Sequence, residues 1–365
     1  MAPFKSGKGR NLGKLCEVFG SADIGEGIGV PPKTEATGGT VVQTSTHKYH
    51  VFHPNTGEPN IFTVTSTITA PGSPMKILVI GGGGSGAGPY VGGGGGAGGV
   101  WHGDNVNIAT GSYPVSIGAG AEPATTPGYP GQRGGTTTFA TPGYTVTSTG
   151  GGGGNQAYYA HEPTGIRDGG SGGGGGVQYA QPGAGGSPIS NGPYPGWVFY
   201  GNAGGAGGPY SPYYDSGGGG GAGGSGTAGT TSGGGNGGAG QAFPDFPGPE
   251  IGPAIPTTTH NGYARTNPER VEFENAVGPT GLFAGGGAGG RIPEAVAPAP
   301  GGTGGGGKSS VYARSPSDGD PAAGAPGVNY TGSGGGANSQ TINGSYPDYV
   351  SRGGTGVVII KYEYS

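Results

Sequence analysis

The chain has 365 residues, of which 98 are Gly and 34 are Pro, and 10% are charged, with a net charge of −4. Gly opposes helix through its backbone entropy and Pro through its missing donor, so we expect almost no α-helix. Low charge together with 20 Tyr and 10 Phe does not fit a disordered linker, the slightly acidic balance does not favour nucleic acid as a partner, and a single cysteine excludes an intrachain disulfide framework.

Residues 1–33 differ in composition from the rest of the chain and open with a basic cluster, MAPFKSGKGRNLGK. Four apolar residues follow at the spacing i, i+3, i+4 and i+7, which predicts one stripe of a short helix ending at Gly20: Leu12, Leu15, Cys16 and Phe19. A helix of two turns is not stable alone, so we interpret residues 1–33 as a segment that docks on another subunit. A tail that packs on its own domain is the alternative.

The chain carries no sign of export or membrane insertion. Residues 1–30 lack the apolar centre of a secretory signal, and no stretch approaches the ~18 apolar residues of a membrane span. We therefore expect a soluble protein that is not inserted in a membrane.

Three stretches between residues 34 and 80 are typical of β-strands. Thr40–Phe52 and Ile61–Ala70 are rich in β-branched and aromatic residues and predict a hairpin with a long loop. Met75–Ile80 (MKILVI) is a continuous apolar run, as in a strand buried on both faces.

Two more strand-like stretches, Asn105–Ile117 and Thr136–Ser148, interrupt the glycine region, and Gly356–Tyr364 follows it. Since one strand leads directly into the glycine region and another leads directly out, we expect Met75–Ile80 and Val357–Tyr362 to share one sheet, with adjacency left open. This predicts a β-strand domain of residues 34–80, completed by 355–365, into which residues 81–354 are inserted.

Runs of glycine recur from Gly81 onward. Without a Cβ, Gly can adopt the extended threefold helix of polyglycine II, which rises ~3.1 Å per residue and leaves its N–H and C=O groups free to bond to neighbouring helices. Such a backbone can be buried only where those groups are paired. The strict Gly-X-Y period of collagen is absent. We predict a mostly β and irregular fold: a small β-sheet domain carrying an inserted polyglycine-II-type helix bundle with β insertions and end loops.

Two glycine motifs match nucleotide-binding patterns without the required context. Gly81-x-Gly83-x-x-Gly86 follows a strand, with Asp104 about 20 residues further on, but the sequence after it cannot form the helix that would hold a pyrophosphate. Residues 302–309 (GTGGGGKS) match a P-loop, yet the flanking sequences predict neither the strand before it nor the helix after it. We interpret both as consequences of composition.

His47, His50 and His53 suggest a metal site, but on one strand His50 faces away from the other two, so the three cannot converge. We favour surface or loop histidines. Asp318 and Asp320 could bind Ca²⁺ in a loop, although a solvated turn is the simpler interpretation. We find no nucleophile–base arrangement, and therefore predict no metal, no cofactor and no enzymatic activity.

Aromatic residues cluster between the glycine runs, where a bundle would have its end loops or flanks. Tyr and Trp on rigid loops provide large contact areas at low entropic cost, and they stack on sugars. The alternative, which also applies to Phe199, Phe243 and Phe246, is that these rings cover the bundle sides or pack on Pro. The receptor-binding candidates are Tyr158, Tyr159, Tyr194, Trp197, Tyr200, Tyr210, Tyr213 and Tyr214.

The order of these elements resembles a known family. The similar parts are, in chain order, HKYHVF…IFTVTS, MKILVIGGGGSGAG, ATGSYPVSIGAG, the glycine runs and a terminal GGTGVVIIKYEY. Over roughly residues 40–365, the chain is similar to the glycine-rich domain of tailed-phage and marine viral tail proteins. The glycine region is also similar in composition to the tip adhesins of T-even-type phages. That resemblance implies a polyglycine-helix sandwich with receptor-binding end loops.

These observations predict a structural protein of a phage virion, with a tail fibre or adhesin favoured over a capsid protein. Residues 1–33 would bind other virion proteins, and the end loops would bind a host-surface glycan or outer-membrane protein. A homo-oligomer is left open. One alternative is an architectural capsid, head-fibre or baseplate decoration protein without a receptor. Another is an ice-binding polyglycine protein, against which the irregular spacing of the runs argues.

Overall fold

The computed structural model describes residues 34–54, 60–66, 74–88, 91–123, 129–156, 166–177, 185–208, 214–258, 267–292, 297–310, 324–338 and 351–363. The predicted docking helix lies outside these ranges, with Leu12, Leu15, Cys16 and Phe19. Four of the receptor-binding candidates also lie outside them: Tyr158, Tyr159, Tyr210 and Tyr213.

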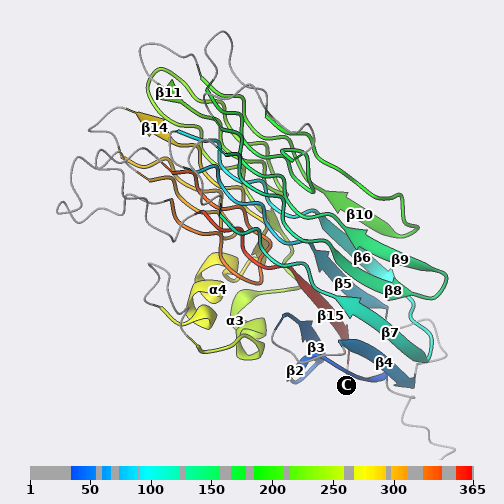
Figure 1. The fold of residues 1–365 in the computed structure, drawn as a ribbon. Helices are drawn as coiled ribbons and strands as arrows, with labels where there is room; N and C mark the ends of the chain where they lie inside the picture. The colour runs from blue at the N-terminus through cyan, green and yellow to red at the C-terminus, as the bar shows by residue number, and fades with distance from the viewer. Residues whose placement is uncertain are drawn as a thin grey trace, which may run out of the picture.

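Two antiparallel sheets form one end of the molecule (Figure 1). The five-stranded sheet has the order β1 (Glu35–Thr37), β4 (Ile61–Ser66), β7 (Gly111–Ser116), β8 (Thr137–Thr141) and β9 (Tyr144–Ser148). The six-stranded sheet has the order β10 (Trp197–Tyr200), β6 (Val100–Val106), β5 (Met75–Ile80), β15 (Val357–Glu363), β3 (His47–Phe52) and β2 (Thr40–Gln43).

β5 and β15 are immediate neighbours, with Ile80 opposite Val357 and Lys76 opposite Lys361. The expectation that the strands before and after the glycine region share one sheet is therefore confirmed. The chain enters the glycine region from β5 and returns from it into β15, so the two ends of that region are fastened side by side.

The hairpin predicted from Thr40–Phe52 and Ile61–Ala70 is wrong. The first stretch is itself a hairpin, β2 and β3, because Thr44 closes a turn. Its N–H donates to the His47 carbonyl at 2.9 Å, and its hydroxyl accepts from the His47 N–H at 3.0 Å. β3 then pairs with β15, whereas β4 pairs with β1 and β7 in the other sheet.

Each of the two strand-like stretches inside the glycine region contributes to two strands. Asn105–Ile117 covers the end of β6 and all of β7, which lie in different sheets. Thr136–Ser148 forms the β8–β9 hairpin, whose turn is made by Pro142 and by Gly143 at a φ of 99°.

An apolar core fills the space between the two sheets, and we call it the inter-sheet core. It takes alternate residues from each central strand, such as Ile77 and Val79 of β5. Its fully buried members include Phe52, Phe62, Phe139, Val358 and Ile360.

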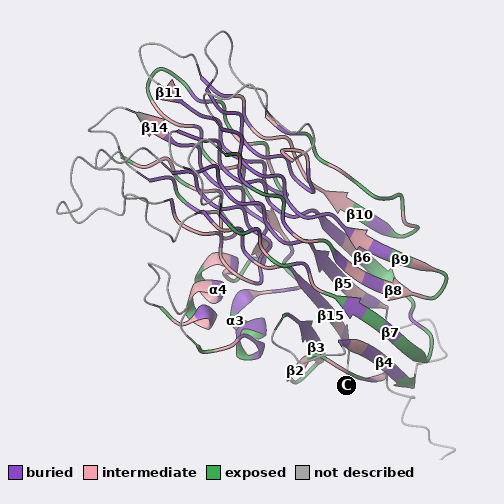
Figure 2. Cartoon of the chain, viewed as in Figure 1, coloured by how far each residue is buried: buried purple, intermediate pink, exposed green. Residues whose placement is uncertain are grey.

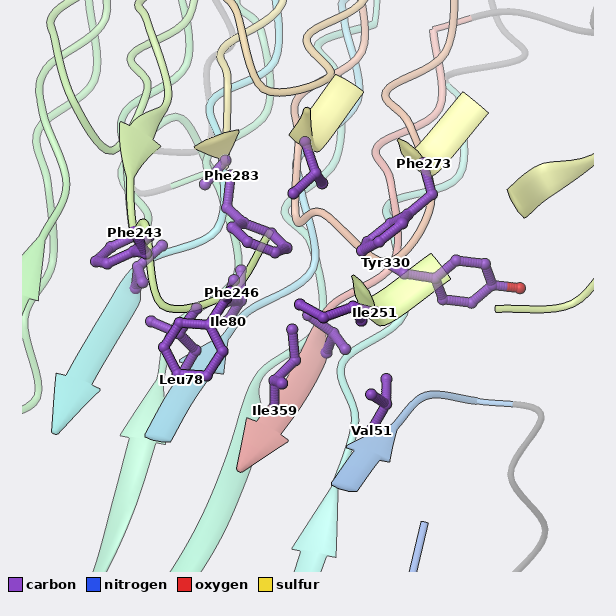
Figure 3. Close-up of a cluster of buried hydrophobic side chains, with 14 of the residues drawn as sticks. Val51, Leu78, Ile80, Phe243, Phe246, Ile251, Phe273, Phe283, Tyr330 and Ile359 are labelled. Atoms are coloured by element: carbon purple, nitrogen blue, oxygen red, sulfur yellow. The ribbon is translucent and has the colours of Figure 1, made fainter. Parts of the chain in front are cut away.

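The opposite face of the six-stranded sheet is covered as well (Figure 3). Leu78 and Ile80 of β5 belong to a second cluster, the helix-side core. Met75–Ile80 is therefore buried on both faces, as predicted. The residues that cover this face are Phe243, Phe246, Ile251, Phe273, Phe283 and Tyr330.

Helix is confined in the described chain to three short elements: α3 (Gly248–Ile251), the 3₁₀ turn η1 (Gly252–Ala254) and α4 (Glu269–Val277). The mostly β and irregular fold with almost no α-helix is as predicted. The remaining strands have two residues each, paired β11 with β14 and β12 with β13: β11 (Tyr214–Asp215), β12 (Gln241–Ala242), β13 (Leu282–Phe283) and β14 (Arg291–Ile292).

The glycine runs extend away from the sheets as a bundle of extended segments, most of which are buried (Figure 2). The amides of residues 93–99 donate to three other runs in rotation, at 2.7 to 3.1 Å. Every third amide reaches the same run, and its acceptors also step by three: Gly93 to Asn155, Gly96 to Gly152 and Gly99 to Thr149; Gly94 to Gly217 and Ala97 to Gly220; Gly95 to Gly335 and Gly98 to Gly332.

Residues 81–88 follow the same rule with a different set of three partners. The pairs are Gly81 to Gly99, Gly84 to Gly96 and Ala87 to Gly93; Gly82 to Gly135, Ser85 to Gln132 and Gly88 to Tyr129; Gly83 to Gly354 and Gly86 to Ser351.

This period of three identifies the backbone geometry. A β-strand alternates between two neighbours in one plane, with a period of two. A helix with three residues per turn instead sends its hydrogen bonds in three directions. The runs are therefore polyglycine-II-type helices, and acceptor numbers that rise in one partner and fall in another show both parallel and antiparallel neighbours.

Candidate functional site

Several glycine helices end together at the far end of the bundle from the two sheets, where β11 and β14 lie (Figure 1). Gly92 is bridged to Gln156, and the Gly290 N–H donates to the Gly92 carbonyl at 2.9 Å. The Ser216 hydroxyl donates to the Val91 carbonyl at 3.0 Å. We call this region the distal end, defined by Val91, Val177, Tyr214, Asp215 and Arg291.

Tyr214 is the one receptor-binding candidate that the structure places at the distal end. It is half-buried and packs on Val91 and Val177, which are 2% and 1% exposed. Its strand β11 pairs with β14, so that Tyr214 lies opposite Ile292. The ring is thus held on a backbone that is itself bonded to its neighbours.

A buried ion pair follows Tyr214 directly and was not predicted from the sequence. Asp215 is fully buried, with its Oδ1 3.3 Å from the Nε of Arg291. The Arg291 guanidinium also donates to the Ser232 carbonyl. Burial raises the pKa of Asp215 to about 6, and the positive charge of Arg291 offsets only part of this rise. The available signal was Asp215 itself, the first charged residue after a run of uncharged ones from 169 to 214.

The other described candidates, Tyr194, Trp197 and Tyr200, lie at the sheet end, on and beside β10. Tyr194 sits edge-on to Trp101, with ring centres 4.8 Å apart, and is stacked on Tyr144 at 5.6 Å. Tyr200 is edge-on to Phe243 at 5.3 Å. We call this cluster the aromatic flank: Trp101, Tyr144, Tyr194, Trp197 and Phe199.

Polar atoms of the aromatic flank are used inside the protein. The Trp197 Nε1 donates to the Tyr144 hydroxyl at 3.1 Å, and the Tyr194 hydroxyl accepts from the Thr147 N–H at 3.1 Å. Trp197 is 7% exposed. These contacts hold the aromatic flank rigid. Val198, which lies between Trp197 and Phe199 on β10, is 53% exposed.

The interpretation of the three histidines as surface or loop residues is wrong for His50 of β3, whereas His53 does lie in the loop after β3, although it is buried. His50 is fully buried, with Nδ1 2.8 Å from the Gly38 carbonyl and Nε2 3.1 Å from the Tyr362 hydroxyl. His53 is 3% exposed, with Nε2 3.2 Å from the Ala254 carbonyl. Burial lowers the pKa of both imidazoles. The reason is that the six-stranded sheet is covered on both faces.

The nucleotide-type motifs are absorbed into the bundle. Residues 81–86 continue β5 as a polyglycine helix, and their amides donate to other runs. In the second motif Gly302 and Gly307 donate to Gly286 and Gly334. Neither motif offers a phosphate its backbone donors at these positions. Asp318 and Asp320 lie outside the described residues.

Among the described residues, no group of three or more His, Cys, Asp or Glu side chains is placed to hold a metal ion. No helix in the same residues is long and apolar enough to cross a membrane.

A family model described as a glycine-rich domain matches residues 60–363, which is most of the chain. The chain belongs to the glycine-rich domain family. No curated protein matches it. The match begins later than the resemblance predicted from residue 40, and β1, β2 and β3 precede it. These strands add β1 to one sheet of the glycine-rich domain and the β2–β3 hairpin to the other.

Proposed function

We propose that this glycine-rich domain protein is a structural component of a phage virion, a tail fibre or adhesin that attaches the particle to a host-surface receptor through its distal end. The observation that carries the proposal is the threefold hydrogen bonding of the glycine helices. Because each helix is bonded to several others, the bundle can hold loops at a fixed position far from the sheets. Pre-organised loops lose little entropy when they bind.

The positions of residue 34 and of Tyr214, at opposite ends of the molecule, support separate ends for docking and for receptor binding. The described chain starts at Thr34, next to β1, and β1 pairs with β4 at the sheet end (Figure 1). Residues 1–33 therefore join the protein at the sheets, whereas Tyr214 lies at the distal end. In the proposal, residues 1–33 bind other virion proteins and the distal end faces the host.

Receptor binding at the distal end is proposed to use aromatic side chains against a glycan or an outer-membrane protein. Tyr214 is already fixed there by Val91 and Val177. Tyr210 and Tyr213 are its near neighbours in sequence, and Tyr158 and Tyr159 follow Gln156, which is bridged to Gly92 at the same end.

Adsorption to host cells tests receptor binding. Replacing Tyr210, Tyr213 and Tyr214 with Ala should reduce adsorption of particles, and purified variant should no longer compete with wild-type particles for the cells. Val271→Ala, at an exposed position on α4, is the control and should leave adsorption unchanged. A melting curve close to that of the wild type would show that the triple variant is folded. Unchanged adsorption by a folded triple variant removes this surface from the proposal.

Particle assembly tests the docking segment separately. Deleting residues 1–33 should abolish incorporation into particles while leaving the melting temperature of the remaining chain unchanged. If the truncated protein still assembles, the docking role is wrong. Normal assembly of the triple variant together with normal adsorption would favour the architectural alternative, a decoration protein without a receptor.

A further inference from the structure

β10 is the outermost strand of the six-stranded sheet, and its outer edge is paired with no other strand in the described part of the chain. It pairs with β6, and no backbone hydrogen bond joins residues 198–200 to any other described part of the chain. Val198 of this strand is 53% exposed. An exposed edge strand presents unpaired N–H and C=O groups to which another strand can bond.

Charges that would protect this edge are absent. Residues 169–214 contain no Asp, Glu, Lys, Arg or His. Natural edge strands usually carry charges, Lys above all, that prevent pairing with another chain. On the opposite side of the two sheets the edge strand β2 is also uncharged, but Lys48 of the adjacent strand β3 lies opposite Gln43 of β2 and forms an ion pair with Glu35 of β1 at 2.8 Å. Neither β9 nor β10 contains a charged residue that could form such a pair.

β9, the outermost strand of the five-stranded sheet, lies beside β10 and is equally uncharged. Residues 134–160 contain no charged residue. The two edges are joined by the hydrogen bonds from Trp197 to Tyr144 and from the Thr147 N–H to Tyr194. β9, β10 and the aromatic flank thus form one rigid strip without charged residues, and we call it the edge strip.

We propose that the edge strip is the interface at which two copies of the chain associate, with β10 of one copy pairing antiparallel to β10 of the other about a twofold axis. A twofold interface brings the same surface of both copies together. A neutral surface can meet itself without like-charge repulsion, and an antiparallel strand pair has the symmetry that a twofold axis requires. Pairing makes the two six-stranded sheets continuous and covers Val198. This interface is independent of receptor binding, because it lies at the sheet end.

The test is the oligomeric state of the full chain by analytical ultracentrifugation. The wild type should form dimers with a micromolar dissociation constant or tighter. Val198→Lys places like charges close together across the twofold axis and should weaken dimerisation about tenfold or more. Val41→Lys is the matched control, since Val41 lies on the opposite edge strand, β2, and is 47% exposed. It should leave the dimer unchanged.

A mixing experiment separates self-pairing from pairing with another edge. Val198→Lys and Val198→Glu should each dimerise about tenfold or more weakly than the wild type, and mixing them should restore tighter association because the two positions lie near each other across the axis. Melting curves like that of the wild type would show that both variants are folded. A wild type that stays monomeric at millimolar concentration overturns the proposal. So does loss of association in both Val198→Lys and Val41→Lys, which would indicate a β10–β2 contact instead.

Discussion

Individual glycines in the bundle are required by close backbone contact. A Cβ built at Gly95 would lie 2.1 Å from the Gly84 carbonyl oxygen and 2.7 Å from its carbon. Backbone atoms of a neighbouring helix cannot rotate aside as a flexible side chain can. The period-three bonding therefore depends on the absence of side chains at such positions, and Ala occurs where its methyl group can be accommodated, as at Ala97, which is fully buried.

Gly95→Ala should accordingly destabilise the protein by about 3 kcal/mol or more, at or above the upper end of the usual cost of overpacking. Thermal or denaturant unfolding measures the change. Gly224→Ala is the matched control, because a Cβ there would come no closer than 3.7 Å to any atom outside its immediate neighbours. It should be neutral or stabilise by up to about 1 kcal/mol. Equal effects of the two substitutions would show that close packing at Gly95 is unimportant.

Asp215 gives the distal end a pH dependence whose sign follows from its raised pKa. The carboxyl titrates at about 6 in the folded protein and at about 3.9 in an unfolded chain. The folded state therefore binds its proton more tightly, so this group lowers stability as the pH rises from about 4 to about 6. Asp215→Asn removes this titrating carboxyl and with it the pH-dependent change in stability.

Comparing the two proteins isolates the effect of Asp215. The melting temperature of the wild type minus that of Asp215→Asn should fall between pH 4 and pH 7, by an amount corresponding to up to about 3 kcal/mol. Melting curves recorded across this range measure it. A difference that stays constant with pH would show that Asp215 is not a buried, shifted carboxyl.

At the scale of elements, the strands were predictable and their partners were not. β-branched and aromatic stretches located β2 to β5, β7 to β9 and β15, since each must contribute side chains to a core. The Thr44 turn that divides the first stretch is a local feature with a weak signal. Pairing across the sheets depends on residues far apart in sequence, such as Phe52 and Val358.

Helix α4 was missed because composition argued against helix everywhere. Its sequence, ERVEFENAV, nevertheless has Phe273 and Val277 four residues apart, both fully buried, and an Arg270–Glu274 ion pair at 2.7 Å. Pro268 precedes it and Gly278, at a φ of 59°, follows it. These are ordinary start and stop signals, and a local window would have found them.

The segment that covers the helix side of the six-stranded sheet is fastened by Asp245. Its carboxylate accepts from the Lys76 Nζ at 2.6 Å and from the Lys361 Nζ at 3.1 Å, so it joins β5 and β15 to the chain leading into α3. The Tyr49 hydroxyl of β3 donates to Glu250 of α3 at 2.7 Å. Charged contacts thus surround the apolar helix-side core at this edge.

Asp245→Asn should loosen this segment. The expected loss is about 1 kcal/mol, because the carboxylate is partly exposed, and hydrogen exchange should become faster at the amides of Phe246 and Ile251. Asp104→Asn is the control: this carboxylate lies 3.7 Å from the Lys76 Nζ and is 53% exposed. It should change neither quantity. Faster exchange in the control alone would contradict the assignment.

On the scale of the whole molecule, the sequence predicted the kind of architecture better than the placement of its aromatic residues. Repeated glycine runs have few ways to be ordered, so a bundle of polyglycine helices followed from backbone chemistry alone. Whether a ring such as Trp197 or Tyr214 covers a flank or lies at an end depends on which runs become neighbours. That is decided by hydrogen bonds such as Gly94 to Gly217, between identical residues that carry no sequence signal.

Because β5 and β15 pair with each other, the two strands that connect to the glycine region are held side by side in one sheet. The glycine helices are also hydrogen-bonded to one another, so a force applied at the distal end is shared by many helices before it reaches the sheets. This rigidity is what the proposed attachment role requires, and it rests on the bonding of the glycine amides.

Hydrogen exchange of those amides, measured residue by residue by NMR, is the most direct test. Interior amides such as those of Gly94, Gly95 and Gly96 should exchange about 10³-fold or more slowly than in an unstructured peptide, whereas Gly143, in the exposed β8–β9 turn, should exchange fast. Exchange of the interior glycines at the rate of an unstructured peptide, with the sheet amides still protected, would contradict the account.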